Sequence, residues 1–171
     1  QVSANFHPSS LNYKRRSMAV QAANKKDKAE VLSDLALTCV KKGDAAKGIG
    51  FYEQALALLE ARSGSELEES RSLLVTVLLN VGVACTLSGD LSASGKYLER
   101  ALAVQEEQVG SESLELVQTL QNLTVVMSKL GETTKAVEYM ARAGEIEAKQ
   151  KAKQDAKDEE NEAPKITEVE A

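Results

Sequence analysis

The residues that could carry chemistry in this sequence are few and widely spaced. His7 is the only histidine among the 171 residues, and Cys39 and Cys85 are the only cysteines. A Ser/His or Cys/His catalytic pair and a histidine-based metal site would each need further groups around His7, which lies in a segment without acidic residues. Two cysteines are too few for a disulfide framework or a four-cysteine zinc site. We therefore expect no catalytic, cofactor-binding or metal-binding residue.

The remaining candidates for chemistry have simpler interpretations. Cys39 and Cys85 fall at equivalent places in two similar helical segments, which predicts small buried hydrophobes, with a redox or metal role as the alternative. The run Gly48-Ile49-Gly50 lacks the preceding strand and the lysine of a phosphate-binding loop. The many glutamates have no evident buried partner that would raise a pKa for acid catalysis. The sequence predicts a protein that is not an enzyme.

The composition fits one globular domain of modest size. The chain is 43% hydrophobic and 27% charged, and its formal charge is −5. That balance fits a single core of modest size and gives no reason to expect nucleic acid as a partner. No run approaches the roughly 18 apolar residues of a membrane-spanning helix, so we expect at most peripheral association through a membrane complex.

The two ends differ in composition from the middle. Residues 1–26 contain Lys and Arg but no Asp or Glu, and Val20–Ala23 resembles the processing site of plastid leaders. We interpret 1–26 as a transit-peptide remnant, which favours the chloroplast over the mitochondrion or cytoplasm, and take the missing initial Met as a sign of truncation. The alternative is a basic arm or tether. Residues 149–171 predict a charged helix extension and a disordered tail.

Residues 27–148 read as helix throughout, and three segments repeat. Each begins with apolar residues three and four apart, such as Leu32, Leu35 and Cys39, which share one helical face. Each continues to a Gly-Asp or Gly-Glu turn, where glycine can end one helix and the acid can start the next. The turn glycines Gly43, Gly89 and Gly131 are 46 and 42 residues apart. Ser65 and Glu68 also have the spacing of a capping box.

These segments resemble the tetratricopeptide repeat family, and the 42-residue spacing is most similar to the kinesin-light-chain subtype. The third unit carries the resemblance best, in Gly110, Val117–Leu123, Leu130-Gly131 and Ala136–Ala143. The resemblance implies an all-α fold, a right-handed α-solenoid of three antiparallel helix pairs with flexible termini. The chain departs from the family at Cys39, Cys85 and Met127, where tyrosine is usual, which predicts modest stability.

The resemblance also implies small residues where paired helices cross, because close backbones leave no room for branched side chains. Nine positions in three registers meet this requirement: Ala36, Gly82 and Thr124; Gly48, Ser94 and Ala136; Ala55, Ala101 and Ala143. If the register is right, Ala101→Leu should overfill a crossing.

In this family the first helices of the pairs line a concave surface that binds peptides or protein surfaces. The candidates for that groove here are Asp34, Leu37, Asn80, Val83, Leu87, Gln121, Asn122 and Val125. Asn80 and Asn122 could pair with the backbone of an extended peptide, or instead with neighbouring helix termini. A clamp for a C-terminal carboxylate would need Lys and Arg where this chain has Ser33, Leu79 and Gln121, so we do not expect a receptor for chaperone tails.

Two roles follow from these patterns. The first is an adaptor or assembly factor, in an organelle, that holds a partner segment in the groove. The second is a structural subunit permanently docked in a large organellar assembly, such as a photosynthetic complex.

Overall fold

The computed structural model describes residues 27–162, and side chains up to residue 158. The basic segment 1–26 and the end of the predicted tail lie outside the described residues. Within the described part of the chain, six α-helices and one 3₁₀ turn follow one another: α2 (Lys28–Lys41), α3 (Ala45–Glu60), α4 (Ser65–Ser88), α5 (Leu91–Val109), η1 (Leu114–Leu116), α6 (Val117–Leu130) and α7 (Thr133–Glu162). Helix α7 thus continues well into the charged segment that begins at residue 149.

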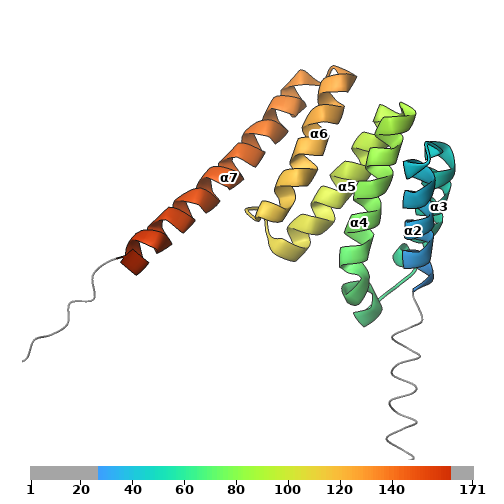
Figure 1. Cartoon of the computed structure of the whole chain (residues 1–171), viewed down its shortest axis with the longest axis horizontal. Coiled ribbons are helices and arrows are strands. Elements are labelled where there is room, and N and C mark those ends of the chain that lie inside the picture. Colours follow the sequence, from blue (N-terminus) through green and yellow to red (C-terminus); the bar gives the residue numbers. More distant parts are fainter. Residues whose placement is uncertain (1–26, 163–171) are drawn as a thin grey trace, which may run out of the picture.

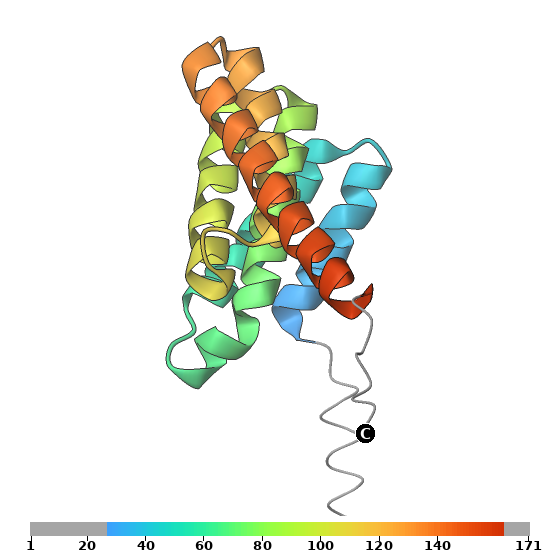
Figure 2. The same ribbon diagram turned by 90° about the vertical axis from the view of Figure 1, so that its left-hand side faces the viewer.

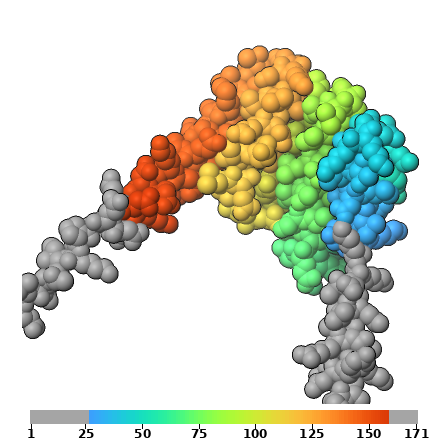
Figure 3. Space-filling view, in the orientation of Figure 1, coloured from blue at the N-terminus to red at the C-terminus, as the bar shows by residue number. Residues whose placement is uncertain are grey.

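The helices pack as consecutive antiparallel pairs, α2 with α3, α4 with α5 and α6 with α7, and α4 and α6 join each pair to the one before it. The pairs form a curved row with α2 and α3 at one end and α7 at the other (Figures 1 and 3). The predicted all-α solenoid of three helix pairs is confirmed.

The turn within each pair forms as the sequence predicts. Gly43, Gly89 and Gly131 all have positive φ, between 80° and 89°. A side chain with a Cβ is strained in that conformation, which explains glycine at these positions. Asp44 and Asp90 then cap the next helix by accepting from the backbone amides of Lys47 and Ala93 at 3.1 and 2.9 Å.

The start of α4 differs from the prediction. Ser65 is already the first helical residue, and Gly64, with φ of 59°, occupies the cap position without a side-chain hydrogen bond. Glu68 pairs with Arg71 at 3.1 Å. The capping box at Ser65 and Glu68 is therefore wrong. Gly64 can reverse the chain immediately before the helix, which moves the helix start past the position where the Ser65 hydroxyl could cap it.

Small residues stand where paired backbones come closest. The Ser94 hydroxyl donates to the Gly82 carbonyl at 2.8 Å, so α4 and α5 touch through a hydrogen bond as well as through packing. A Cβ at Gly82 would lie 2.8 Å from Cγ of Leu98, and one at Gly48 would lie 3.0 Å from the carbonyl oxygen of Ala36. A Cβ at Gly48 would also lie 2.5 Å from Cγ2 of Val40, so a larger residue at either glycine requires a neighbouring side chain to shift.

Buried apolar side chains form two adjoining clusters. One joins α2, α3 and α4 and includes Tyr52, Leu59 and Val81, and the other joins α5, η1, α6 and α7 and includes Leu98 and Leu123. Helix α4 is long and apolar enough to cross a membrane by length and composition, but half of that stretch is buried in the protein. Because α4 packs against α3, α5 and α6, its place in the core accounts for its apolar character.

Candidate protein-binding groove

Four of the eight predicted groove residues lie together in one hollow between α4 and α6. The hollow has a volume of about 140 Å³. Val83 and Leu87 come from α4, one turn apart, and Asn122 and Val125 come from α6. Leu98 of α5 lies in its wall together with Thr86 and Val126. The exposed Leu87 and Val125 side chains flank this hollow, which suits an apolar group of a partner.

A second, larger hollow of about 400 Å³ lies between α6 and α7. The predicted residues Gln121 and Val125 line it, so Val125 borders both hollows. Met140 and Gly144 of α7 form its other side. The two hollows meet at Val125, and we refer to them together as the apolar groove, which has lining residues on α4, α6 and α7.

The other predicted residues lie outside these hollows. Asp34 and Leu37 are exposed on α2, and Asn80 is half-buried on α4. Asn122, which does line the first hollow, accepts a hydrogen bond from Gln118 of its own helix at 3.4 Å. The structure therefore separates the two asparagines that the repeat register makes equivalent.

Sequence reasoning missed the contribution of α7. Met140 aligns with the buried Tyr52 and Leu98, yet it is exposed and lines the second hollow. Its burial would require a further helix over α7, and none of the described elements lies there. Thr124 and Ala143, predicted from the helix crossing, also border this hollow.

The apolar groove carries almost no charge. Glu147 is the single ionisable residue among the side chains that line the two hollows. The amides of Gln121 and Asn122 and the hydroxyls of Thr86 and Thr124 provide the remaining polar groups. Such a lining can accept apolar side chains and hydrogen-bond a peptide backbone, but it offers no cation for a carboxylate or phosphate.

Cys85 lies in the core, as predicted, and Cys39 is half-buried. Burial raises the pKa of the Cys85 thiol to about 11, with smaller effects from Asp90 and Glu53. The raised pKa favours the neutral thiol at physiological pH, as expected of a buried structural cysteine rather than of a nucleophile. Among the described residues, no three His, Cys, Asp or Glu side chains gather as a metal site would require.

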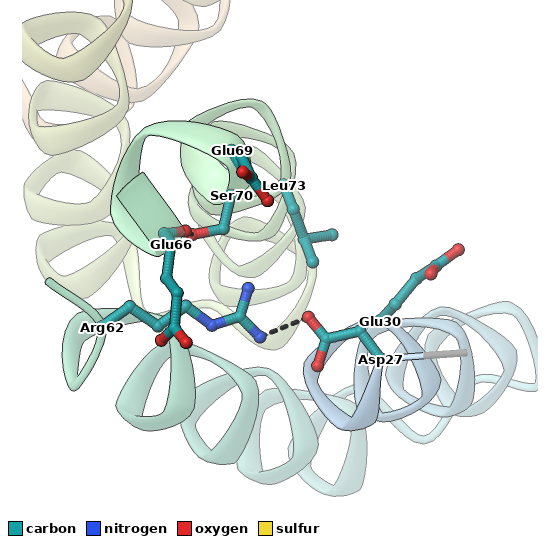
Figure 4. Close-up of a pocket in the computed structure, with 7 residues that line it drawn as sticks. All are labelled: Asp27, Glu30, Arg62, Glu66, Glu69, Ser70 and Leu73. Carbon is teal, nitrogen blue, oxygen red and sulfur yellow. Dashed lines mark hydrogen bonds and ion pairs between the residues drawn. The ribbon is translucent and has the colours of Figure 1, made fainter. Parts of the chain in front are cut away.

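A polar pocket of about 430 Å³ lies where α2 starts and α3 turns into α4 (Figure 4). Arg62 forms an ion pair with Asp27 across it. The hydrogen bond from Arg62 lowers the pKa of Asp27. Asp27 also caps α2 by accepting from the Ala29 amide at 3.2 Å. These contacts fix the start of α2 against the α3–α4 connection, so we interpret them as structural.

A buried polar contact that the sequence did not reveal joins α5 to α6. The Thr119 hydroxyl donates to Oε1 of Gln105 at 2.6 Å, and Nε2 of Gln105 donates to the Glu115 carbonyl at 3.3 Å. Both side chains are buried, so each needs the other's hydrogen bond. This contact holds α6, one wall of the apolar groove, against α5.

Comparison with known proteins agrees with this architecture. Residues 73–146 match the tetratricopeptide repeat family. A Podosopora anserina protein described as a kinesin light chain with nearly identical TPR-like repeats is similar in structure, with a TM-score of 0.58 and 20% identity over 70% of this chain and 55% of that chain. BtubC (BKLC) from P. vanneervenii gives a TM-score of 0.60 and 22% identity over 94% of this chain and 60% of that chain.

At such identities the likeness concerns the fold. This chain spans between 55% and 60% of the length of these two structures. No curated protein matches the sequence.

Proposed function

Because residues 73–146 identify this chain as a tetratricopeptide repeat protein, with kinesin-light-chain-like structural neighbours, we propose that it is a non-catalytic protein–protein interaction module. Its apolar groove holds a segment of a partner protein. The observation that carries this proposal is the exposed row of Val83, Leu87, Val125 and Met140, which lies across three helices and faces solvent in the described structure. Exposed apolar side chains grouped in this way favour a binding surface.

The lining of the groove defines the partner's chemistry. The first hollow has no ionisable side chain, and the second has Glu147 at its edge. A charged segment would lose hydration there without gaining an ion pair. We therefore expect the partner to insert apolar side chains and to use its backbone to pair with Gln121 and Asn122. Ser33, Leu79 and Gln121 stand where a carboxylate clamp would need Lys and Arg, so the bound segment is internal rather than C-terminal.

The wider role we propose is that of an adaptor or assembly factor in an organelle, with the plastid favoured. This part rests on the sequence of residues 1–26, which are free of Asp and Glu and resemble a plastid leader. The alternative role is a structural subunit docked permanently in a large organellar complex, for which a photosynthetic complex is the first candidate.

Substitution in the groove tests the binding surface. Leu87→Gln and Val125→Gln keep good helix formers while removing the apolar side chains. Leu114→Gln is the matched control, because Leu114 is similarly exposed but lines neither hollow. The bait chain should recover its partner from native extract as wild type and as the Leu114 variant, and should lose it in both groove variants. Equal recovery by all four chains would exclude the groove.

The stoichiometry in the same experiment separates the two roles. An adaptor should be recovered partly free, and a peptide from its partner should bind with micromolar affinity. A subunit should co-purify with fixed partners in fixed ratio, and the free chain should melt well below the complex. Import of the chain into isolated plastids and mitochondria, with residues 1–26 present or removed, followed by protease protection, tests the location.

A further inference from the structure

The α2 end of the row exposes apolar positions that are buried in the other repeats. Val31 and Leu35 are 46% and 42% exposed. The residues at the same positions in α4, 46 residues later, are Val77 and Val81, and both are fully buried. In α4 these positions are covered by α3, the second helix of the preceding pair. On α2, no described helix takes the place of α3.

At the other end of the row, α7 also exposes apolar side chains at positions that are buried in the preceding repeat. Seen from that end, α7 lies in front and no other described element lies over it (Figure 2). Val137 and Met140 are 52% and 58% exposed, whereas Leu98, at the position of Met140 in α5, is 1% exposed. In α5 that face is covered by α6, the first helix of the next pair.

The two uncovered faces are the two halves of a junction that the chain already forms twice. Helix α3 packs on α4, and α5 packs on α6. In the second junction, Leu98 of α5 and Leu123 of α6 share a buried cluster. Met140 of α7 occupies the position of Leu98, and Leu35 of α2 occupies the position of Leu123.

We propose that the chain associates head to tail with a second copy of itself, with α7 of one copy packing on α2 of the next. Such a contact joins two different faces, so it can repeat and extend the solenoid from copy to copy. The occupant of each end face is thus another copy of this chain, held by the geometry of its internal junctions.

The lining of the apolar groove also fits this arrangement. In the first hollow, Val83 and Leu98 face a wall made by Asn122, Val125 and Val126 of α6. In the second hollow the equivalent residues are Val125 and Met140, but the equivalent wall is missing.

The residues of α2 that correspond to that wall are Asp34, Leu37 and Thr38. A second copy docked on α7 would therefore close the second hollow with two residues that the repeat register also places on the binding surface. The contact would lengthen the groove across both copies.

Polar contacts between neighbouring second helices change in a matched way at the two ends. Inside the chain, Tyr97 donates to Glu53 and Tyr139 donates to Glu99, each at 3.3 Å. In α7 the residue aligned with Glu53 and Glu99 is Ala141, and in α3 the residue aligned with the two tyrosines is Phe51. The hydroxyl and the carboxylate are thus replaced together.

The ion pairs of the same helices follow the same rule. Arg100 pairs with Glu60, and Arg142 pairs with Glu106. In α7 the residue aligned with the two glutamates is Ala148, and in α3 the residue aligned with the two arginines is Gln54. Helix α7 thus has no glutamate at this position that would lack an arginine, and α3 has no arginine that would lack a glutamate. A contact between copies would therefore bury no unpaired charge here, as a buried interface requires.

Glu147 of the α7 face corresponds to Gln105, whose amide donates to the Glu115 carbonyl in η1 and accepts from Thr119. By the same register Glu115 corresponds to Asp27, Leu116 to Lys28 and Thr119 to Val31. Glu147 would therefore make neither of those hydrogen bonds in the junction, and Lys28 is the one cation among the described residues at the start of α2. The charged end of α7 beyond Ala148 corresponds to no part of α3, which ends at Glu60, so it passes beyond this junction.

Sedimentation equilibrium over a range of concentrations, up to the solubility limit, tests the contact. The wild-type chain should show a weight-average mass that rises with concentration above the monomer mass of 18.4 kDa. Val137→Glu blocks the α7 face and Leu35→Glu blocks the α2 face, so each variant alone should stay monomeric. Leu114→Glu, at a similarly exposed position on η1 rather than on α2 or α7, should associate like wild type. Circular dichroism confirms that each variant is folded.

Mixing the two blocked variants is the decisive step. The Leu35 variant still has its α7 face and the Val137 variant still has its α2 face, so the mixture should form a dimer of twice the monomer mass and stop there. A wild-type chain that remains monomeric overturns the proposal. A mixture that stays monomeric also overturns the proposal, because two complementary faces should pair when each variant supplies one of them. Val137 and Leu35 line neither hollow, so partner capture by the two monomeric variants tests the groove of a single copy and is scored apart from self-association.

Discussion

Two neighbouring residues of α4 show how one helix serves both the fold and the proposed binding surface. Gly82 is buried where α5 crosses, and a single added carbon there would meet Leu98 at 2.8 Å. Val83, the next residue, is 42% exposed and lines the apolar groove. A helix turns about 100° per residue, so consecutive positions can face a close crossing and an open groove.

The difference between the two faces predicts different tolerance to substitution. At the crossing, backbone and side chains are fixed by close contact, so a change in volume affects the whole pair of helices. In the groove, the side chains have solvent on one side, so a change there alters what can bind while leaving the fold intact. The predictions below run from the crossing to the groove, in order of decreasing effect on stability.

Gly82→Leu should have the largest effect. The new side chain would overlap Leu98 and push α5 away from α4, which should lower the free energy of unfolding by about 3 kcal/mol. Gly50→Ala is the control, because nothing lies within 4 Å of a Cβ at that helical glycine, and it should raise stability by about 0.5 to 1 kcal/mol. Urea denaturation followed by circular dichroism measures both. Equal midpoints for the two variants would show that the crossing is looser than the structure indicates.

Ala101→Leu tests the crossing register at a second position. Ala101 is fully buried, and a leucine there should cost about 2 kcal/mol by overfilling the contact. Ala103 lies two residues further along α5 and is exposed, so Ala103→Leu should change stability by less than about 0.5 kcal/mol. Thermal melts compare the two. An Ala101 variant that melts like its parent would overturn the register of the repeats.

Thr119→Val tests the buried polar contact behind the groove. Valine keeps the shape of threonine but removes the donor to Gln105, which should cost about 1 to 2 kcal/mol because the buried amide oxygen loses its partner. Thr76→Val removes an exposed hydroxyl that donates to the Ser72 carbonyl and should change stability by less than about 0.5 kcal/mol. Similar urea midpoints for both variants would mean that water replaces the lost donor.

Asp27→Asn tests a partly exposed ion pair, whose loss should cost less stability than the loss of a buried contact and more than a change at an exposed side chain. Asparagine still caps a helix but loses the ion pair with Arg62. The partial exposure of both side chains limits the loss at neutral pH to about 1 kcal/mol or less.

The effect of Asp27→Asn should depend on pH. The folded state lowers the pKa of Asp27, so the carboxylate stabilises the protein above its unfolded pKa of about 3.9. That stabilisation is lost as the pH falls through the folded pKa, and the variant and wild type should converge there. Denaturation at neutral and acidic pH measures this.

The crossings could be predicted from sequence because they are steric. A close approach admits only small residues whatever surrounds it, so Ala36, Gly48, Gly82 and Ser94 identify it by type and spacing. The turn glycines are readable for the same reason, since positive φ restricts the choice of residue. The start of α4 was not readable, because Gly64 and Ser65 both suit a helix start and the chain geometry decided between them.

The groove could be predicted only in part. Counting along the first helices finds Val83, Leu87, Asn122 and Val125, because they share a register. Met140 could not be found this way, since its exposure depends on whether another helix covers α7, which lies outside the repeat pattern. Gln105 and Thr119 also escaped the sequence reasoning, because polar residues in a helix resemble surface positions until a buried partner is known.

Leu87→Gln should have the smallest effect on stability among these variants, as expected of a side chain that lies in the groove and not at the helix crossing. Leu87 is 67% exposed, and glutamine is nearly as good a helix former, so the free energy of unfolding should change by less than about 0.5 kcal/mol. The same variant should nevertheless lose the partner in the capture experiment. A large loss of stability would instead place Leu87 in the core, and the faces of α4 would then no longer divide between folding and binding. Chemical denaturation and capture by one purified batch settle which description holds, because both properties are measured on the same folded protein.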